Sequence, residues 1–270
     1  MIMKQLDPST YEHPTDRTAL MALKKVPLLD TVATWVLNFL IKTDYLVLYR
    51  GNAIEVTEKT LPRVHNLKSI AAERLCLNMD VPMFVTLEWE YNAFAAGVDH
   101  PIIVLNSGLV ENFTDEELLS IIGHEMGHIK SRHMLYHWMA DNLSKWMYST
   151  SIISGPALYG LIIAMKEWQR KSELTADRAG LIANNDNKDA AIMAQMKLMG
   201  LPDNYNTSPD WNFTVEDILE QAQDQKEFKE DSFYKKIIYA IATGPIDHPW
   251  SAERIREMRE WQMQLHYTES

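Results

Sequence analysis

Three residues in the middle of the chain could bind a metal ion and activate water. His124, Glu125 and His128 form an H-E-x-x-H pattern within the run His124-Glu125-Met126-Gly127-His128. Residues four apart lie on one face of a helix, so both imidazoles can point at one ion while Glu125 projects beside them. The spacing therefore predicts a zinc centre for hydrolysis, with Glu125 as the general base.

A catalytic zinc needs a third ligand from the protein. A histidine ten residues after His124 would give the extended metzincin pattern, but Met134 occupies that position. Further along, Glu173 and Asp177 lie four apart on one predicted helix face. We expect Glu173 to complete the ligand set for one zinc ion per chain, and Asp177 to accept a hydrogen bond from a ligating imidazole. The alternative for this acidic pair is an exposed helix face.

Two further histidines, His133 and His137, also lie four residues apart. If they continue the same helix, they point to other faces than His124 and His128, so we expect them at the surface. The structural alternative for the first pair is that His124 and His128 are ordinary core histidines.

The helix that carries the motif has a clear start signal. Thr114 is a favourable N-cap, Glu117 follows three residues later, and apolar residues recur at helical spacing into the 130s. Two other helices are predicted by apolar periodicity, over 28–41 and over 61–77, the latter with Pro62 in its first turn.

Two β-rich runs precede the motif helix, at 83–87 and 101–105. They predict strands of a small sheet, and the fold class that follows is α+β, predominantly helical, with a small mixed β-sheet packed on the HExxH helix. No repeat or low-complexity tract divides the chain. We expect an N-terminal helical lead-in over 1–45, followed by one metallopeptidase domain over 46–270.

The composition limits the binding partners and the cellular compartment that we expect for this protein. The formal net charge is −11 and the pI is near 5.3, so bulk charge does not favour nucleic acid as a partner. The single cysteine, Cys76, cannot form an internal disulfide, and the first residues lack the apolar core of a signal peptide. These features predict a cytoplasmic protein.

The chain resembles the gluzincin zinc metallopeptidase family that contains the HtpX heat-shock protease and the CAAX prenyl protease. The resemblance runs from about Leu46 to Trp261 and is carried by four blocks, which are Asn92-Ala93-Phe94-Ala95-Ala96-Gly97, Ile122 to His128, Glu173 to Asp177, and Asp247-His248-Pro249 with Arg254. It implies a zincin-like fold and a peptide or protein substrate.

The resemblance also implies roles for residues outside the zinc set. Asn92 would bind substrate backbone, and His248 would help stabilise the oxyanion. Arg254 would brace that corner of the site and is expected among the substrate-binding residues. The run at 102–105, with Ile103, resembles the family's active-site edge strand, which would bind an extended peptide by strand addition. The alternatives are a simply buried strand for that run, and a packing or capping role for His248 in a turn before the last helix.

The best-known relatives are integral membrane proteins, whereas this chain has a single long uncharged window, at 146–165. Gly155 and Pro156 would break a helix there, and a single span would separate His124 from Glu173. We therefore expect a soluble, prokaryotic-type member of the family, with a buried helical hairpin or a peripheral membrane contact at this window.

The function predicted from the sequence is that of a zinc-dependent endopeptidase, in which Glu125, His248 and Asp177 support the catalysis. The competing hypothesis is a latent protease, or a non-catalytic zinc-binding module that serves interaction or regulation. Glu125 argues against a purely binding role, because metal binding alone does not require a general base.

Overall fold

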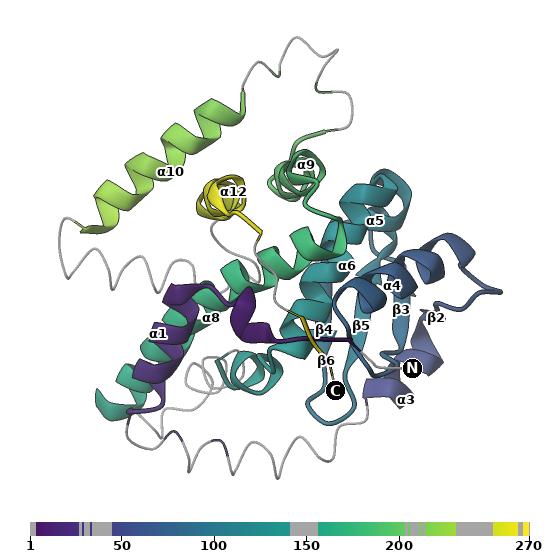
Figure 1. Cartoon of the computed structure of the whole chain (residues 1–270), viewed down its shortest axis with the longest axis horizontal. Coiled ribbons are helices and arrows are strands. Elements are labelled where there is room, and N and C mark those ends of the chain that lie inside the picture. The colour runs from purple at the N-terminus through teal and green to yellow at the C-terminus, as the bar shows by residue number, and fades with distance from the viewer. Residues whose placement is uncertain are drawn as a thin grey trace.

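The computed structural model is mostly helical, with a small sheet on one side (Figure 1). It describes residues 4–26, 29, 33, 45–140, 156–202, 205, 211, 214–230, 251–263 and 267–269. The helix predicted over 28–41 lies outside these ranges, apart from residues 29 and 33. The predicted fold class, a mainly helical α+β chain of zincin type, is confirmed.

Four strands form the sheet that lies beside the motif helix. Their spatial order is β2-β3-β5-β4, and their bounds are β2 Ile54–Glu55, β3 Met83–Thr86, β5 Ile102–Asn106 and β4 Ala93–Ala96. β3 and β5 run parallel, while the two outer pairs are antiparallel, so the sheet is mixed as predicted. The two β-rich runs in the sequence correspond to β3 and β5.

The expectation that the run at 102–105 is an edge strand is wrong. Ile103 in β5 is paired with Met83 of β3 on one side and with Ala95 of β4 on the other. Its side chain is fully buried. Because both backbone edges of β5 are used by neighbouring strands, a substrate cannot pair with it, and Ile103 is a core residue. The strand at this edge of the sheet is β4, whose alanine-rich sequence gives a weak strand signal.

Besides a helical stretch at 134–140, nine helices of six or more residues lie within the described ranges. They are α1 Pro14–Leu23, α3 Tyr45–Asn52, α4 Pro62–Arg74, α5 Ser107–Asn112, α6 Asp115–Lys130, α8 Pro156–Ala183, α9 Lys188–Leu198, α10 Val215–Glu230 and α12 Ser251–Glu260. Pro62 begins α4 as predicted. The predicted start of α6 is also confirmed, because Thr114 and Glu117 form a reciprocal capping box.

Helices α6 and α8 pack closely because small residues line their contact. A Cβ added at Gly123 would come 2.2 Å from the Cβ of Ala183, and one added at Gly127 would come 2.5 Å from the Cβ of Ala179. Real Cβ atoms do not approach this closely, so the two backbones meet where no side chain fits between them. The helix with the HExxH motif and the helix with Glu173 are therefore held at a short, fixed separation.

The described part of the lead-in is packed onto the rest of the molecule. Helix α1 lies along α8 (Figure 1). Strand β1, Lys4–Leu6, pairs antiparallel with β6, Tyr267–Glu269, and a short 3-10 turn at Pro8–Thr10 connects β1 towards α1. The boundary predicted at residue 45 stays a prediction, but α1 contributes directly to the core of the domain.

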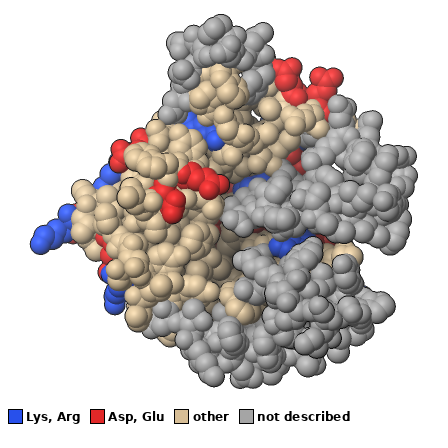
Figure 2. Space-filling view, turned by 180° about the vertical axis from the view of Figure 1, so that it is seen from behind, with Lys and Arg blue, Asp and Glu red and all other residues tan. Residues whose placement is uncertain are grey.

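The charged surface is divided into small groups. On the face drawn in Figure 2, acidic and basic side chains lie in several separate groups, with uncharged surface between them. Within the described ranges, no helix combines the length and the apolar character that crossing a bilayer requires. Half of the window at 146–165 lies outside those ranges, and its described half, 156–165, belongs to α8.

Candidate metal centre

Three side chains from two helices converge in the interior. His124 and His128 come from α6, and Glu173 comes from α8. The Nε2 atoms of the two histidines are 3.1 Å apart, and each lies 3.4 Å from a carboxylate oxygen of Glu173. All three side chains are buried. The structure thus brings together the three ligands that the sequence predicts.

This donor set fits a zinc ion. Ligand atoms at about 2.0–2.1 Å from a tetrahedral zinc lie roughly 3.3–3.4 Å from one another. The separations between His124, His128 and Glu173 are close to this value before any ion is added. Two imidazole nitrogens and one carboxylate are a usual ligand set for a catalytic zinc, which keeps its fourth position for water or substrate.

Behind the ligands, Asp177 and Arg254 hold His124 in place. The Nδ1 atom of His124 is 3.0 Å from Oδ1 of Asp177, one turn after Glu173 on α8. Arg254, from α12, donates to both oxygens of Asp177 at 2.8 and 2.6 Å, and its Nη1 atom lies 3.4 Å from Glu173. Arg254 is only 2% exposed. Its contacts are those of a brace for the ligand set rather than of a residue that faces substrate.

The charges in this cluster depend on one another. Burial alone would raise the pKa of Asp177, but the charge of Arg254 and the hydrogen bonds from Arg254 and His124 outweigh burial and lower the pKa. Burial lowers the pKa of His128, and the hydrogen bond to Glu173 does not compensate for it. For His124, the hydrogen bonds to Asp177 and Glu173 outweigh burial and raise the pKa. Asp177 therefore stays ionised beside the ligating ring of His124.

Glu125 lies within the same charged cluster. It directly follows His124 on α6, and its side chain is 2% exposed. Its negative charge contributes to the raised pKa of Arg254, where burial acts in the opposite direction. The role of Glu125 as the general base stays a prediction.

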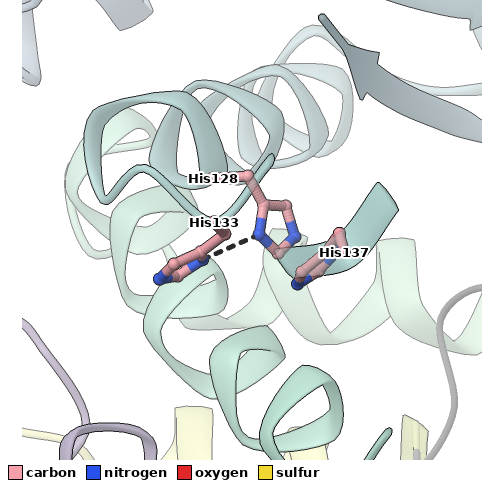
Figure 3. Close-up of side chains that lie close together, drawn as sticks. All are labelled: His128, His133 and His137. Atoms are coloured by element: carbon pink, nitrogen blue, oxygen red, sulfur yellow. Dashed lines mark hydrogen bonds between the residues drawn. The ribbon is translucent and has the colours of Figure 1, made fainter. Parts of the chain in front are cut away.

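The expectation that His133 and His137 lie at the surface is wrong. His133 is 4% exposed, and its Nδ1 atom lies 3.0 Å from Nδ1 of His128 (Figure 3). α6 ends at Lys130, and a separate helical stretch at 134–140 follows, so the helical phase used for the expectation is lost. His137 is half-buried, and its Nε2 atom is 2.7 Å from the hydroxyl of Ser172.

One residue near the centre has no signal in the sequence. Asp16, from α1, lies 3.4 Å from Nε2 of His133 and is fully buried. It precedes the HExxH motif by more than a hundred residues and belongs to no motif. The packing of α1 on α8 brings Asp16 to this location.

Two predicted residues, Asn92 and His248, are not among the contacts described above. Asn92 immediately precedes β4, and its carbonyl accepts a hydrogen bond from the backbone N–H of Asn106, 3.0 Å away. His248 lies outside the described residues. The roles predicted for Asn92 in substrate binding and for His248 in oxyanion stabilisation therefore stay predictions.

Comparison with known proteins gives a match over most of the chain. The sequence profile of peptidase family M48 matches residues 62–262, which include the HExxH motif, Glu173, Asp177 and Arg254. The lead-in with Asp16 lies before this range.

Individual relatives are similar over different lengths. A plastoglobule-localized chloroplastic metallopeptidase 48 of Arabidopsis thaliana is 28% identical over 99% of this chain and 76% of its own length. An HtpX protease homologue of Moorella thermoacetica is 33% identical over 34% of this chain and 31% of its own. One from Streptococcus pyogenes is 29% identical over 45% and 41%. The match to these HtpX homologues thus spans less than half of either chain. No solved structure gave a match.

Proposed function

Because this chain belongs to peptidase family M48 and is a metalloprotease, we propose that it is a zinc-dependent endopeptidase with one zinc ion per chain. The observation that carries this proposal is the convergence of His124, His128 and Glu173 at separations suited to tetrahedral zinc. Its substrates are peptides or proteins.

A zinc ion in this position supplies Lewis-acid chemistry, since it lowers the pKa of a water molecule and polarises a carbonyl group. The carboxylate of Glu125 accepts a proton from the attacking water and then delivers it to the nitrogen of the leaving amine. Asp177 fixes the ring of His124 through Nδ1, and Arg254 fixes Asp177. His248 is proposed to donate a hydrogen bond to the oxyanion.

Substrate binding is proposed to use the edge of the sheet at β4. β4 ends the sheet on one side and lies next to α6, which carries the ligands. An extended peptide that aligns with β4 would therefore run beside the metal centre, with Asn92 at the start of the strand. This arrangement replaces the role expected for Ile103.

Hydrolysis of casein and metal analysis of the same preparations test the proposal. Glu125→Gln should keep zinc but lose activity, because an amide cannot act as a base. His128→Ala should lose both zinc and activity. Glu116→Gln, on an exposed residue of the same helix, is the matched control and should behave as wild type.

Two results would contradict the proposal. Unchanged zinc content in His128→Ala would remove the ligand assignment. Zinc binding by the wild type without hydrolysis of casein or other unfolded proteins would favour the alternative of a latent protease or a zinc-binding module. Proteolytic trimming that then releases activity would identify latency.

A peripheral membrane contact is proposed as the mode of localisation. The plant relative is by name localised to plastoglobules, and the sequence predicts a peripheral membrane contact at the uncharged window 146–165. Flotation with lipid vesicles tests this contact. A protein that stays at the bottom of the gradient would disprove it.

A further inference from the structure

The ring of His128 faces two different environments. Its Nε2 atom points to the candidate metal position, 3.1 Å from Nε2 of His124 and 3.4 Å from Glu173. On the opposite side of the ring, its Nδ1 atom lies 3.0 Å from Nδ1 of His133 (Figure 3). Both histidines are buried, so neither nitrogen can exchange this contact for bulk water.

The contact between the two rings has a defined direction once Nε2 of His128 binds a metal ion. A neutral imidazole carries one proton, and a ring that gives its Nε2 lone pair to a metal must carry that proton on Nδ1. His128 is then the donor, and Nδ1 of His133 is the acceptor. His133 must carry its own proton on Nε2.

The Nε2 atom of His133 faces a carboxylate. Oδ2 of Asp16 lies 3.4 Å away, within ion-pair distance, and both side chains are buried. Burial alone would raise the pKa of Asp16, but the contact with His133 and the hydrogen bond from Thr175 lower it. An ionised carboxylate is a strong acceptor for the N–H group of His133.

Asp16 is itself held in place by the helix that carries Glu173. The hydroxyl of Thr175, two residues after Glu173 on α8, donates to Oδ2 of Asp16. The same hydroxyl oxygen accepts a hydrogen bond from the backbone N–H of His13, 3.0 Å away, at the N-terminus of α1. Asp16 also lies in the first turn of α1, where the helix dipole favours a negative charge.

We propose that Asp16 and His133 form a hydrogen-bonded relay that orients His128 through its Nδ1 atom and strengthens its Nε2 atom as a metal ligand. Asp16 and His133 are positioning residues, because they act through His128 and contact neither ion nor substrate. The inference rests on the proposed function for the ion itself.

With this relay, each of the two ligating histidines is connected to a buried carboxylate. His124 reaches Asp177 directly, and His128 reaches Asp16 through His133. Carboxylates behind metal-bound imidazoles fix the tautomer and increase the basicity of the ligand. Asp16 precedes the range that the family profile matches, so the lead-in would take part in the metal centre.

The competing hypothesis is that His128, His133 and His137 bind a second metal ion. Two observations favour the relay. His137 has Ser172 as a hydrogen-bond partner. His128 would also have to lose both ring protons to bridge two ions.

Zinc affinity, measured by competition with a chelator at one fixed pH, tests the relay. Asp16→Asn and His133→Ala should each weaken zinc binding about 10- to 100-fold, the usual effect of losing such a partner. His133→Gln, whose amide oxygen can accept from Nδ1 of His128, should recover part of this loss. Glu257→Gln is the control, because it removes the negative charge beside His13, at the N-terminus of α1, without changing a relay residue.

Nitrogen NMR of the histidine rings in the zinc-loaded wild type gives a second readout, which a merely structural role would not produce. The relay requires a proton on Nδ1 of His128 and on Nε2 of His133. The opposite tautomer of His133, or unchanged zinc affinity in both Asp16→Asn and His133→Ala, would overturn the relay alone.

Two further outcomes separate the hypotheses. Two zinc ions per chain, with one lost in His137→Ala, would replace the relay by the second metal site. A wild-type protein that binds no zinc would overturn the proposed function together with the relay.

Discussion

The Nδ1 atom of His124 lies 3.0 Å from Oδ1 of Asp177, so the first histidine of the motif is joined to a carboxylate one turn beyond Glu173. Both side chains are buried, and Arg254 donates two hydrogen bonds to the same carboxylate. This contact ties α6, α8 and α12 together directly behind the candidate metal position.

Replacing Asp177 with Asn should weaken zinc binding about 10- to 100-fold, because the amide is a weaker acceptor for the N–H of His124 and can present its own donor instead. Chelator competition measures the affinity. Asp189→Asn, an exposed position at the start of α9, is the matched control. Equal affinities in the two variants would disprove the role of Asp177.

Replacing Arg254 with Met should lower the free energy of unfolding by about 3–5 kcal/mol, because it leaves the carboxylates of Asp177 and Glu173 buried without their positive partner. Saturating zinc should restore part of this loss, since the ion supplies positive charge at Glu173. Urea unfolding with zinc and with chelator measures both effects. Arg254→Lys should be intermediate, because lysine lacks the two-pronged geometry. A loss that zinc does not reduce would contradict the electrostatic explanation.

Replacing Gly127 with Ala should destabilise the protein by about 1–3 kcal/mol, although alanine is the better helix former. The new methyl group would meet the Cβ of Ala179 at 2.5 Å and push α8 away from α6. Zinc affinity should fall as well, since Glu173 moves with α8. Gly51→Ala in α3, where nothing lies within 4 Å, is the control and should not be destabilising. Thermal unfolding and chelator competition test both expectations.

The contact between α1 and α12 should make stability depend on acid pH. The hydrogen bond from His13, 3.1 Å long, is the main reason that the pKa of Glu257 falls from 4.5 to about 2, against the effect of burial. A lowered folded-state pKa stabilises the protein above pH 4.5, and this contribution is lost as the pH falls towards 2. Because Glu257 is partly exposed, we expect about 1 kcal/mol.

Urea unfolding at pH 6 and at pH 3.5 measures this contribution. Glu257→Gln should be less stable than wild type at pH 6, and the difference should shrink at pH 3.5. A constant difference at both pH values would show that the carboxylate charge of Glu257 does not contribute.

The parts of the site that the sequence predicts are those set by local spacing. Two histidines four apart must share a helix face, and Thr114 with Glu117 defines the start of that helix. Strand order depends instead on pairing between distant segments, and nothing in the β-rich run of Ile103 distinguishes an inner strand from an edge. The surface expectation for His133 failed for a related reason, because α6 ends at Lys130 and the helical phase does not continue.

The contact of Asp16 with the site could not be predicted from the sequence. A single aspartate near the start of a helix usually indicates no more than a favourable dipole contact. Its contact with His133 arises from tertiary packing between α1 and the segment after α6, which no spacing rule within the sequence can predict. Pairs of buried polar residues far apart in sequence become recognisable only when their helices are placed.

The small residues between α6 and α8 have a consequence for the choice of ion. Two helices in backbone contact at Gly123 and Gly127 cannot approach further, and separating them would cost packing, so the gap between His128 and Glu173 has a nearly fixed width. Ions that need longer bonds and more oxygen ligands, such as calcium, would be excluded by size and coordination number. Cobalt(II) is close to zinc in radius and also forms tetrahedral complexes, so it should bind at this site. The distance between two helices would thus select metal ions by their radius.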